Sequence, residues 1–146
     1  MTHITKPTAM PFRILYSMIR VADLGRSIAF YQNVLGMHEL RRETFPEGRF
    51  TLVFMGYDND ANNAQIELTY NWDQSAYTHG TGYGHTALEV ADITAACDRM
   101  AAMGAKIIRA PGPMKLAPIE TGEYENIAFL EDPDGYKIEL IEAAAR

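Results

Sequence analysis

Two glutamates are the residues whose type and position in this sequence point most directly to chemistry. Glu67 and Glu139 each stand between an isoleucine and a leucine in a strand-like stretch, so in both cases the apolar neighbours lie on the opposite face. An unpaired carboxylate in a half-buried strand is costly, because desolvation favours its neutral form. A metal ion, another cation or solvent on that face has to compensate. The simplest interpretation is a solvated sheet face with two surface glutamates.

A histidine and a sequence repeat favour a metal site instead. Val21-Ala22-Asp23 recurs as Val90-Ala91-Asp92 at an offset of 69, and Ile66-Glu67-Leu68 recurs as Ile138-Glu139-Leu140 at an offset of 72. His85 begins a predicted strand, and the first offset makes Tyr16 its counterpart. Two carboxylates and an imidazole form a suitable ligand set for a borderline divalent cation. The repeat therefore predicts that four side chains converge: Tyr16, Glu67, His85 and Glu139.

The elements that must position these residues follow one plan twice. Alternation predicts a strand at 14–21, Asp23 predicts the start of a helix that ends at Gly36, and strands follow at about 37–45, 50–57 and 64–71. The second half predicts a strand at 85–90, a helix from Asp92 to Gly104, and strands at about 106–110, 126–131 and 135–142. We therefore predict an α+β fold of two tandem βαβββ modules, at 13–71 and 82–142, after a flexible N-terminal arm at 1–12.

Composition limits the classes of function. The chain has 146 residues, of which 47% are hydrophobic and 22% charged, enough for one domain with its own core. Thirteen basic against 19 acidic residues give a formal charge of −6, which argues against a nucleic-acid partner. No apolar run approaches the roughly 18 residues of a membrane span. The N-terminus lacks a signal-peptide core, and the single cysteine, Cys97, excludes an internal disulfide. We expect a cytoplasmic protein that does not act on membranes.

Several segments resemble one known family. RILYSMIRVADLGRSIAFYQNVLGM, IELTYNW, GYGH and FLEDPDGYKIELIE are similar to segments of glyoxalase I (lactoylglutathione lyase) in the vicinal-oxygen-chelate superfamily, and the resemblance covers nearly all of residues 13–142. It implies paired βαβββ modules whose mixed sheets curl around a metal site, and a homodimer with active sites built from both subunits. It also implies isomerisation of the glutathione–methylglyoxal hemithioacetal to S-lactoylglutathione through an enediolate. The resemblance further implies one divalent metal ion per site (nickel, cobalt or zinc) and glutathione as co-substrate.

The same resemblance implies roles for individual residues. The four metal-ligand positions of the family fall on Tyr16, Glu67, His85 and Glu139, with Glu139 as the principal base and Glu67 serving the other face of the hemithioacetal. The family has His or Gln at the first position, where this chain has Tyr16. Four alternatives stay open there: a five-coordinate or water-completed site, a tyrosinate ligand, an altered metal preference, or an impaired site. Tyr16 is equally well interpreted as an aromatic residue at the edge of the core.

Three further polar side chains are predicted to bind the substrate. Arg20 shares the predicted strand face of Tyr16, where a cation can meet a glutathione carboxylate. Asn71 directly follows the strand of Glu67 and carries an amide suited to peptide groups, and Arg109, before a Pro-Gly-Pro loop, matches a basic, glutathione-facing position of the family. The segment 113–125 is long, and we expect either a lid or interface element, or a tolerated surface insertion.

Two other functions stay open. One is a superfamily enzyme with different metal chemistry, such as an epimerase or a dioxygenase, against which ELTYNW and GYGH argue. The other is a catalytically impaired small-molecule binding protein that kept the fold and lost a metal ligand at Tyr16. Nothing in the sequence indicates a nucleophile, a nicotinamide site or a phosphate loop, since Cys97 lies on an apolar helix stripe and no glycine fingerprint opens a helix.

Overall fold

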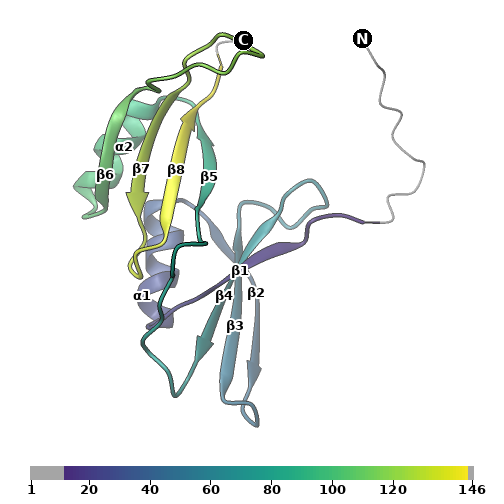
Figure 1. Ribbon diagram of the computed structural model, residues 1–146. Helices are drawn as coiled ribbons and strands as arrows, with labels where there is room; N and C mark the ends of the chain where they lie inside the picture. The colour runs from purple at the N-terminus through teal and green to yellow at the C-terminus, as the bar shows by residue number, and fades with distance from the viewer. Residues whose placement is uncertain (1–11, 145–146) are drawn as a thin grey trace.

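The computed structural model describes residues 12–144, so the predicted arm lies outside the described residues apart from its last one. Within that range the strands form two four-stranded mixed sheets (Figure 1). Sheet 1 has the order β1 (Tyr16–Arg20), β4 (Gln65–Asn71), β3 (Phe50–Gly56), β2 (His38–Phe45). Sheet 2 repeats it with β5 (His85–Val90), β8 (Lys137–Glu142), β7 (Asn126–Glu131), β6 (Lys106–Pro113). In each sheet the first and last strands of the module pair in parallel, which confirms the predicted duplication of a βαβββ unit.

Each module contains a helix that begins at an aspartate. The side chain of Asp23 accepts a hydrogen bond from the backbone N–H of Arg26 at 3.0 Å and begins α1 (Leu24–Ala29). Asp92 accepts one from the N–H of Ala95 at the same distance and begins α2 (Ile93–Ala102). An aspartate at this position accepts from an N–H group that has no partner within the helix. Both predicted helix starts are therefore confirmed.

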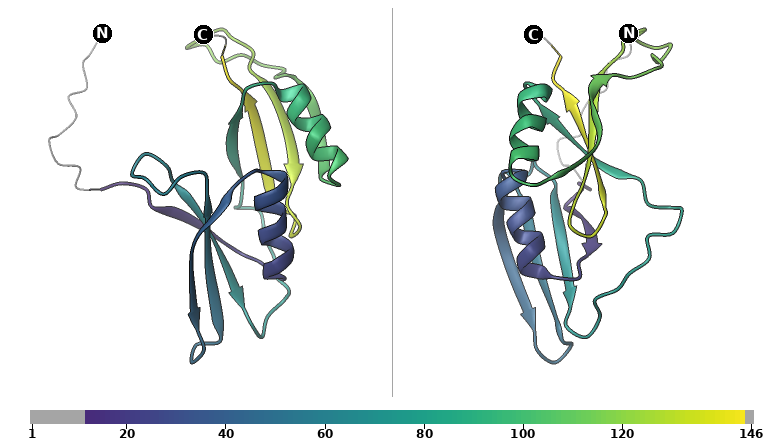
Figure 2. Two further views of the ribbon diagram at one scale, coloured as in Figure 1. Left: turned by 180° about the vertical axis from the view of Figure 1, so that it is seen from behind. Right: turned by 90° about the vertical axis from the view of Figure 1, so that its left-hand side faces the viewer.

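Alternation along the strands gives each sheet two different faces. One face packs against the helices, and its buried residues form a single cluster that spans both modules and includes Val53, Leu68, Leu130 and Leu140. Figure 2 shows α1 and α2 one above the other on the same side of the molecule. We call the opposite faces, which carry Glu67 and Glu139, the open faces of the two sheets.

The turn between β7 and β8 joins the two modules through buried polar groups. Asp132 accepts hydrogen bonds from the hydroxyl of Tyr31 at 2.8 Å and from the backbone N–H groups of Asp134 and Tyr136, both at 2.9 Å. Asp134 in turn accepts from three groups of the first module: the N–H of Ala22 (3.0 Å), the guanidinium of Arg26 (3.2 Å) and the hydroxyl of Ser27 (3.2 Å). The turn is therefore fixed to the first module at several points.

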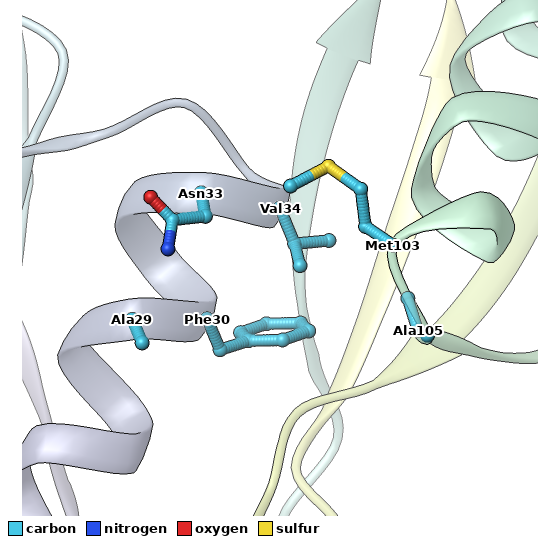
Figure 3. Close-up of a pocket in the computed structure, with 7 residues that line it drawn as sticks. Ala29, Phe30, Asn33, Val34, Met103 and Ala105 are labelled. Atoms are coloured by element: carbon cyan, nitrogen blue, oxygen red, sulfur yellow. The ribbon is translucent and has the colours of Figure 1, made fainter.

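A hollow of about 270 Å³ lies at a second junction, between the end of the first helix and the end of α2 (Figure 3). Here α1 continues as a π-helix, η1 (Phe30–Val34), and Arg99 of α2 donates to the carbonyl oxygen of Val34 at 2.6 Å. Carbonyls at a helix C-terminus lack partners within the helix, and Arg99 supplies one. The residues that line this hollow, all within the described range, include no titratable group, so it is not a site for acid–base or metal chemistry.

The structure differs from several predicted element boundaries, and the last strand, for example, begins at Lys137 instead of residue 135. The first strand begins at Tyr16 instead of residue 14, and the first helix changes to a π-helix at Phe30. The predicted end of a strand at residue 110 is wrong, because β6 continues through Pro111 to Pro113. Proline is tolerated there because β6 is an edge strand with register shifts on both sides of Arg109. None of the helices in residues 12–144 is long and apolar enough to cross a membrane.

Candidate metal centre and active site

His85 and Glu139 lie next to each other on the open face of sheet 2. The Nε2 atom of His85 is 3.1 Å from Oε1 of Glu139, whose side chain is only 14% exposed. The parallel pairing of β5 and β8 places His85 opposite Lys137, two residues before Glu139. Phe129 is opposite Glu139 in β7, and its ring packs edge-on against the imidazole with 5.2 Å between centroids. The structure thus brings together two of the predicted metal ligands.

Glu67 lies on the open face of sheet 1 and is 6% exposed. This burial excludes the interpretation of Glu67 as a solvated surface residue. Its Oε2 atom accepts a hydrogen bond of 2.6 Å from the hydroxyl of Thr69, which is also buried. Thr69 is a residue whose role the sequence analysis missed. The signal was available, because a threonine two positions along a strand lies on the same face as the glutamate.

Tyr16 has the same place in sheet 1 as His85 has in sheet 2. Tyr16 is opposite Gln65, two residues before Glu67, as His85 is opposite the residue two before Glu139. Its ring packs edge-on against Phe54 with 5.0 Å between centroids, and Phe54 is opposite Glu67 in β3. The register therefore makes Tyr16 and His85 equivalent, as their offset of 69 predicts.

A single chain holds two half-sites. Half-site 1 consists of Tyr16 and Glu67, and half-site 2 consists of His85 and Glu139, each on the open face of its own sheet. Across residues 12–144, no three His, Cys, Asp or Glu side chains lie close enough together to hold one metal ion. The four predicted ligands therefore do not converge within one chain, because each sheet positions only its own pair.

The donor atoms of the half-sites fit a divalent metal ion. Carboxylate oxygen and imidazole nitrogen are the ligands that borderline cations such as Ni²⁺, Co²⁺ and Zn²⁺ accept in proteins. The 3.1 Å separation of His85 and Glu139 allows both to turn toward one ion. The hydroxyl of Thr69 orients the carboxylate of Glu67 in the way that outer-shell partners orient metal ligands. A neutral phenol is a poorer ligand than an imidazole, which makes Tyr16 the weakest member of the set.

Arg20 and Asn71 lie at the same end of the open face of sheet 1, beyond Glu67 along the strands. Arg20 is opposite Thr69 and lines a cavity of about 340 Å³ together with Tyr77. The side-chain amide of Asn71 lies 3.2 Å from the hydroxyl of Tyr77 and donates to it. The segment between the modules thus brings Tyr77 to two of the three predicted substrate-binding residues, Arg20 and Asn71. Nothing in the local sequence pattern singled out Tyr77.

Arg109 lies on the open face of sheet 2 and has a structural role as well. It lines a cavity of about 380 Å³ together with His85 and Lys137, which places it near half-site 2. Its guanidinium donates to backbone carbonyl oxygens of four residues, Ala110, Gly112, Ile127 and Pro113, at 2.8 to 3.1 Å. The group therefore stabilises the irregular end of β6.

The long segment between β6 and β7 is a loop whose apolar side chains are exposed. The N–H of Met114 donates to the carbonyl of Glu125 at 2.9 Å and closes the base of the loop. Leu116 and Ile119 are largely exposed. Exposed apolar side chains on a loop favour an interface element over a solvated insertion.

The chain is similar to known proteins in sequence and in fold. Residues 13–140 match the family described as the Glyoxalase/Bleomycin resistance protein/Dioxygenase superfamily. The chain is 52% identical to the lactoylglutathione lyase of Haemophilus influenzae, covering 89% of this chain and 92% of that protein. It is 50% identical to the lactoylglutathione lyase of Neisseria meningitidis serogroup B, covering 89% and 90%.

A solved structure gives the same result for the fold. Glyoxalase I from Zea mays superposes with a TM-score of 0.83 and 39% sequence identity, and the match covers 91% of this chain. The matched part is 45% of the maize chain, so this chain spans less than half the length of that protein. From the family match, the curated relatives and the common fold, the chain belongs to the lactoylglutathione lyases (glyoxalase I) of the Glyoxalase/Bleomycin resistance protein/Dioxygenase superfamily.

Proposed function

We infer that this chain catalyses the glyoxalase I reaction, in which the hemithioacetal of glutathione and methylglyoxal is isomerised to S-lactoylglutathione. The reaction moves a proton between adjacent carbons through an enediolate, so it needs a base beside the carbon acid and stabilisation of the developing oxygen charge. The observation that best supports it is the 3.1 Å contact between His85 and Glu139. Tyr16 and the buried Glu67 have the equivalent positions in sheet 1.

We propose Glu67, His85, Glu139 and Tyr16 as the residues that hold a divalent metal ion, namely Ni²⁺, Co²⁺ or Zn²⁺. Such an ion, when bound, acts as a Lewis acid toward the substrate oxygens. Glu139 is the principal base, which takes the proton from one substrate carbon and returns it to the next. Glu67, held by Thr69, serves the other face of the hemithioacetal.

We propose that Arg20, Asn71 and Arg109 bind glutathione. The guanidinium of Arg20 pairs with a carboxylate, and the amide of Asn71 binds the peptide groups. Supporting this, Arg20 and Asn71 share one end of the open face that carries Glu67, and both lie near Tyr77. Arg109 contributes a positive charge beside half-site 2. The cytoplasmic location remains a prediction.

A homodimer is the arrangement that completes the site, since one chain contains only half-sites. We propose that half-site 1 of each subunit meets half-site 2 of the other, so that two carboxylates and an imidazole surround one ion. The largely exposed loop between β6 and β7 is suited to lie at that interface.

The test is isomerisation of methylglyoxal and glutathione by protein loaded in turn with Ni²⁺, Co²⁺, Zn²⁺ and Mn²⁺, with the bound metal measured in each sample. We expect formation of the thioester and close to one equivalent of metal per site with at least one ion. Bound metal without isomerisation would favour other superfamily chemistry, such as an epimerase or a dioxygenase. Less than about a tenth of an equivalent of any divalent metal would favour a small-molecule binding protein.

A further inference from the structure

Beside each half-site, an arginine lies in one row with the glutamate and a phenylalanine. Pairing across neighbouring strands gives the row Arg41, Phe54, Glu67 in sheet 1 and the row Arg109, Phe129, Glu139 in sheet 2. In both modules a register shift of the edge strand immediately precedes the arginine. The two arginines therefore have equivalent positions.

The two guanidinium groups nevertheless have different partners. Arg109 donates to four backbone carbonyls, which use most of its hydrogen-bonding capacity. The guanidinium carbon of Arg41 lies 4.0 Å from the ring centroid of Phe54. In the described part of the chain its ion-pair partner is Glu43, with Nε and Oε2 3.7 Å apart, and the side chain of Arg41 is 55% exposed. The N–H groups of Arg41 thus stay available to a ligand.

Arg41 also determines what a bound molecule meets beside Glu67. Phe54 is on the open face, yet only 1% exposed, because Arg41 lies over its ring and Tyr16 packs against its edge. Two strand spacings, about 10 Å, separate the backbones of Arg41 and Glu67. The guanidinium over Phe54 extends into that gap. On the β2 side of Glu67, a substrate therefore contacts a cation with free donors.

We propose that Arg41 is a specificity-determining residue that selects 2-oxoaldehydes whose substituent carries an oxygen acceptor, a conclusion that rests on the proposed function. The hemithioacetal extends from its reacting carbons in two directions, through sulfur to glutathione and through the carbonyl carbon to the substituent of the aldehyde. Arg20 and Asn71 bind the glutathione part, which therefore lies along the strands of sheet 1. The substituent then points across the strands, toward Arg41.

The physical basis is the cost of leaving charged donors without partners. An oxygen on the substituent accepts a charge-assisted hydrogen bond from Arg41, which is stronger than a bond between neutral groups. A branched alkyl substituent displaces water from the guanidinium and gives no acceptor in return, which is unfavourable. Sites built to donate hydrogen bonds reject analogues that lack the acceptor.

The experiment compares kcat/KM for two aldehydes with glutathione, hydroxypyruvaldehyde and isopropylglyoxal, with methylglyoxal as the reference. For Arg41→Leu we expect the hydroxypyruvaldehyde-to-isopropylglyoxal ratio of kcat/KM to fall by about tenfold or more. Arg42→Gln is the matched control, because Arg42 is the next residue on the opposite face and pairs with Glu39 at 2.8 and 3.1 Å. The control should leave the ratio unchanged.

The outcomes separate this inference from the proposed function. An unchanged ratio in Arg41→Leu overturns the role of Arg41, and isomerisation of methylglyoxal by the wild type then leaves glyoxalase I activity standing. Failure of the wild-type protein to isomerise any of the three adducts with any metal overturns the proposed function instead. If Arg41→Leu does not fold, Arg41→Met supplies the same comparison, and Arg41→Lys, which keeps the charge, should give an intermediate ratio.

Discussion

The proposed base, Glu139, is the side chain whose loss should affect the chemistry most. Glu139→Gln keeps the shape but removes the negative charge, so the residue can neither take a proton nor bind a cation strongly. We expect kcat/KM with methylglyoxal and glutathione to fall by a factor of at least about 10² to 10⁴, while the melting temperature stays close to that of the wild type. The measurement is the thioester assay together with thermal unfolding.

A glutamate elsewhere in the same sheet serves as the matched control. Glu131 of β7 pairs with Lys106 at 3.4 Å, and Glu131→Gln should leave kcat/KM nearly unchanged. If Glu139→Gln keeps more than about half of the wild-type kcat/KM, the assignment of Glu139 as base is wrong, because loss of an essential base costs far more than a factor of two.

Tyr16 stands at the position where the family resemblance implies a His or Gln metal ligand. Because Tyr16 has the position that His85 has in sheet 2, Tyr16→His places a second imidazole at an equivalent point. We expect tighter binding of Ni²⁺, Co²⁺ or Zn²⁺, measured by competition with a chromophoric chelator, and a higher turnover. Tyr16→Phe, which keeps the contact with Phe54 and removes the hydroxyl, is the control. Equal affinity and turnover in the wild type and Tyr16→His would show that position 16 does not reach the metal.

Residue-level prediction from the sequence worked where a residue type and its repeat position agreed. The alternation around Glu67 and Glu139 was sufficient to place both on one face of their strands, and the offset to His85 identified Tyr16 as its counterpart. Contacts between segments distant in sequence could not be predicted this way. The stacking of Arg41 on Phe54 depends on strand pairing and a register shift, which alternation along one strand does not reveal.

At the scale of elements, the β7–β8 turn links pH to stability through Asp132. Burial raises the pKa of this carboxyl above its ordinary value, although hydrogen bonds from Tyr136, Tyr31 and Asp134 act in the opposite direction. For an acid with a raised pKa in the folded state, the stabilisation is complete below the unfolded pKa, about 4, and is lost as the pH rises through the folded pKa. Asp132 therefore makes the native state less stable as the pH increases from the unfolded pKa toward and through the raised folded pKa.

The prediction concerns Asp132→Asn, which cannot ionise and keeps one oxygen for the backbone N–H groups. As the pH increases from about 4 to 7, we expect the free energy of unfolding of the wild type to fall relative to that of the variant. Urea unfolding at several pH values measures this difference. Tyr31→Phe, which retains the carboxyl, serves as the control and should keep a pH-dependent profile. A difference for Asp132→Asn that stays constant over the pH range would contradict the raised pKa.

Element boundaries show where local signals are sufficient and where they are not. Asp23 and Asp92 began helices as predicted, because an N-cap is a contact between residues close in sequence. The proline-containing end of β6 was missed, since only its place at the edge of the sheet permits Pro111 and Pro113 in a strand. The π-helix at Phe30–Val34 was not predicted, and the residue that donates to its last carbonyl oxygen, Arg99 of α2, is distant in the sequence.

At the scale of the whole molecule, duplication explains why one chain has two half-sites. Each βαβββ module builds the same open face, with a glutamate on its last strand and a partner on its first. Only the second module has a histidine as that partner, so neither half-site alone supplies the two carboxylates and the imidazole of the proposed metal site. In the proposed site, a half-site of each kind faces the other across two subunits. A two-fold symmetric dimer provides two such pairings at once.

This arrangement predicts complementation between two inactive variants. In Glu67→Gln every site of the homodimer lacks the carboxylate of half-site 1, and in Glu139→Gln every site lacks that of half-site 2. A mixed dimer has one site with both defects and one with none, so unfolding and refolding an equimolar mixture should restore about a quarter of the wild-type activity, half of the dimers having one intact site. Refolding each variant alone is the control and should restore none. Absence of recovery in a mixture that demonstrably forms mixed dimers would mean that each site is built within one chain.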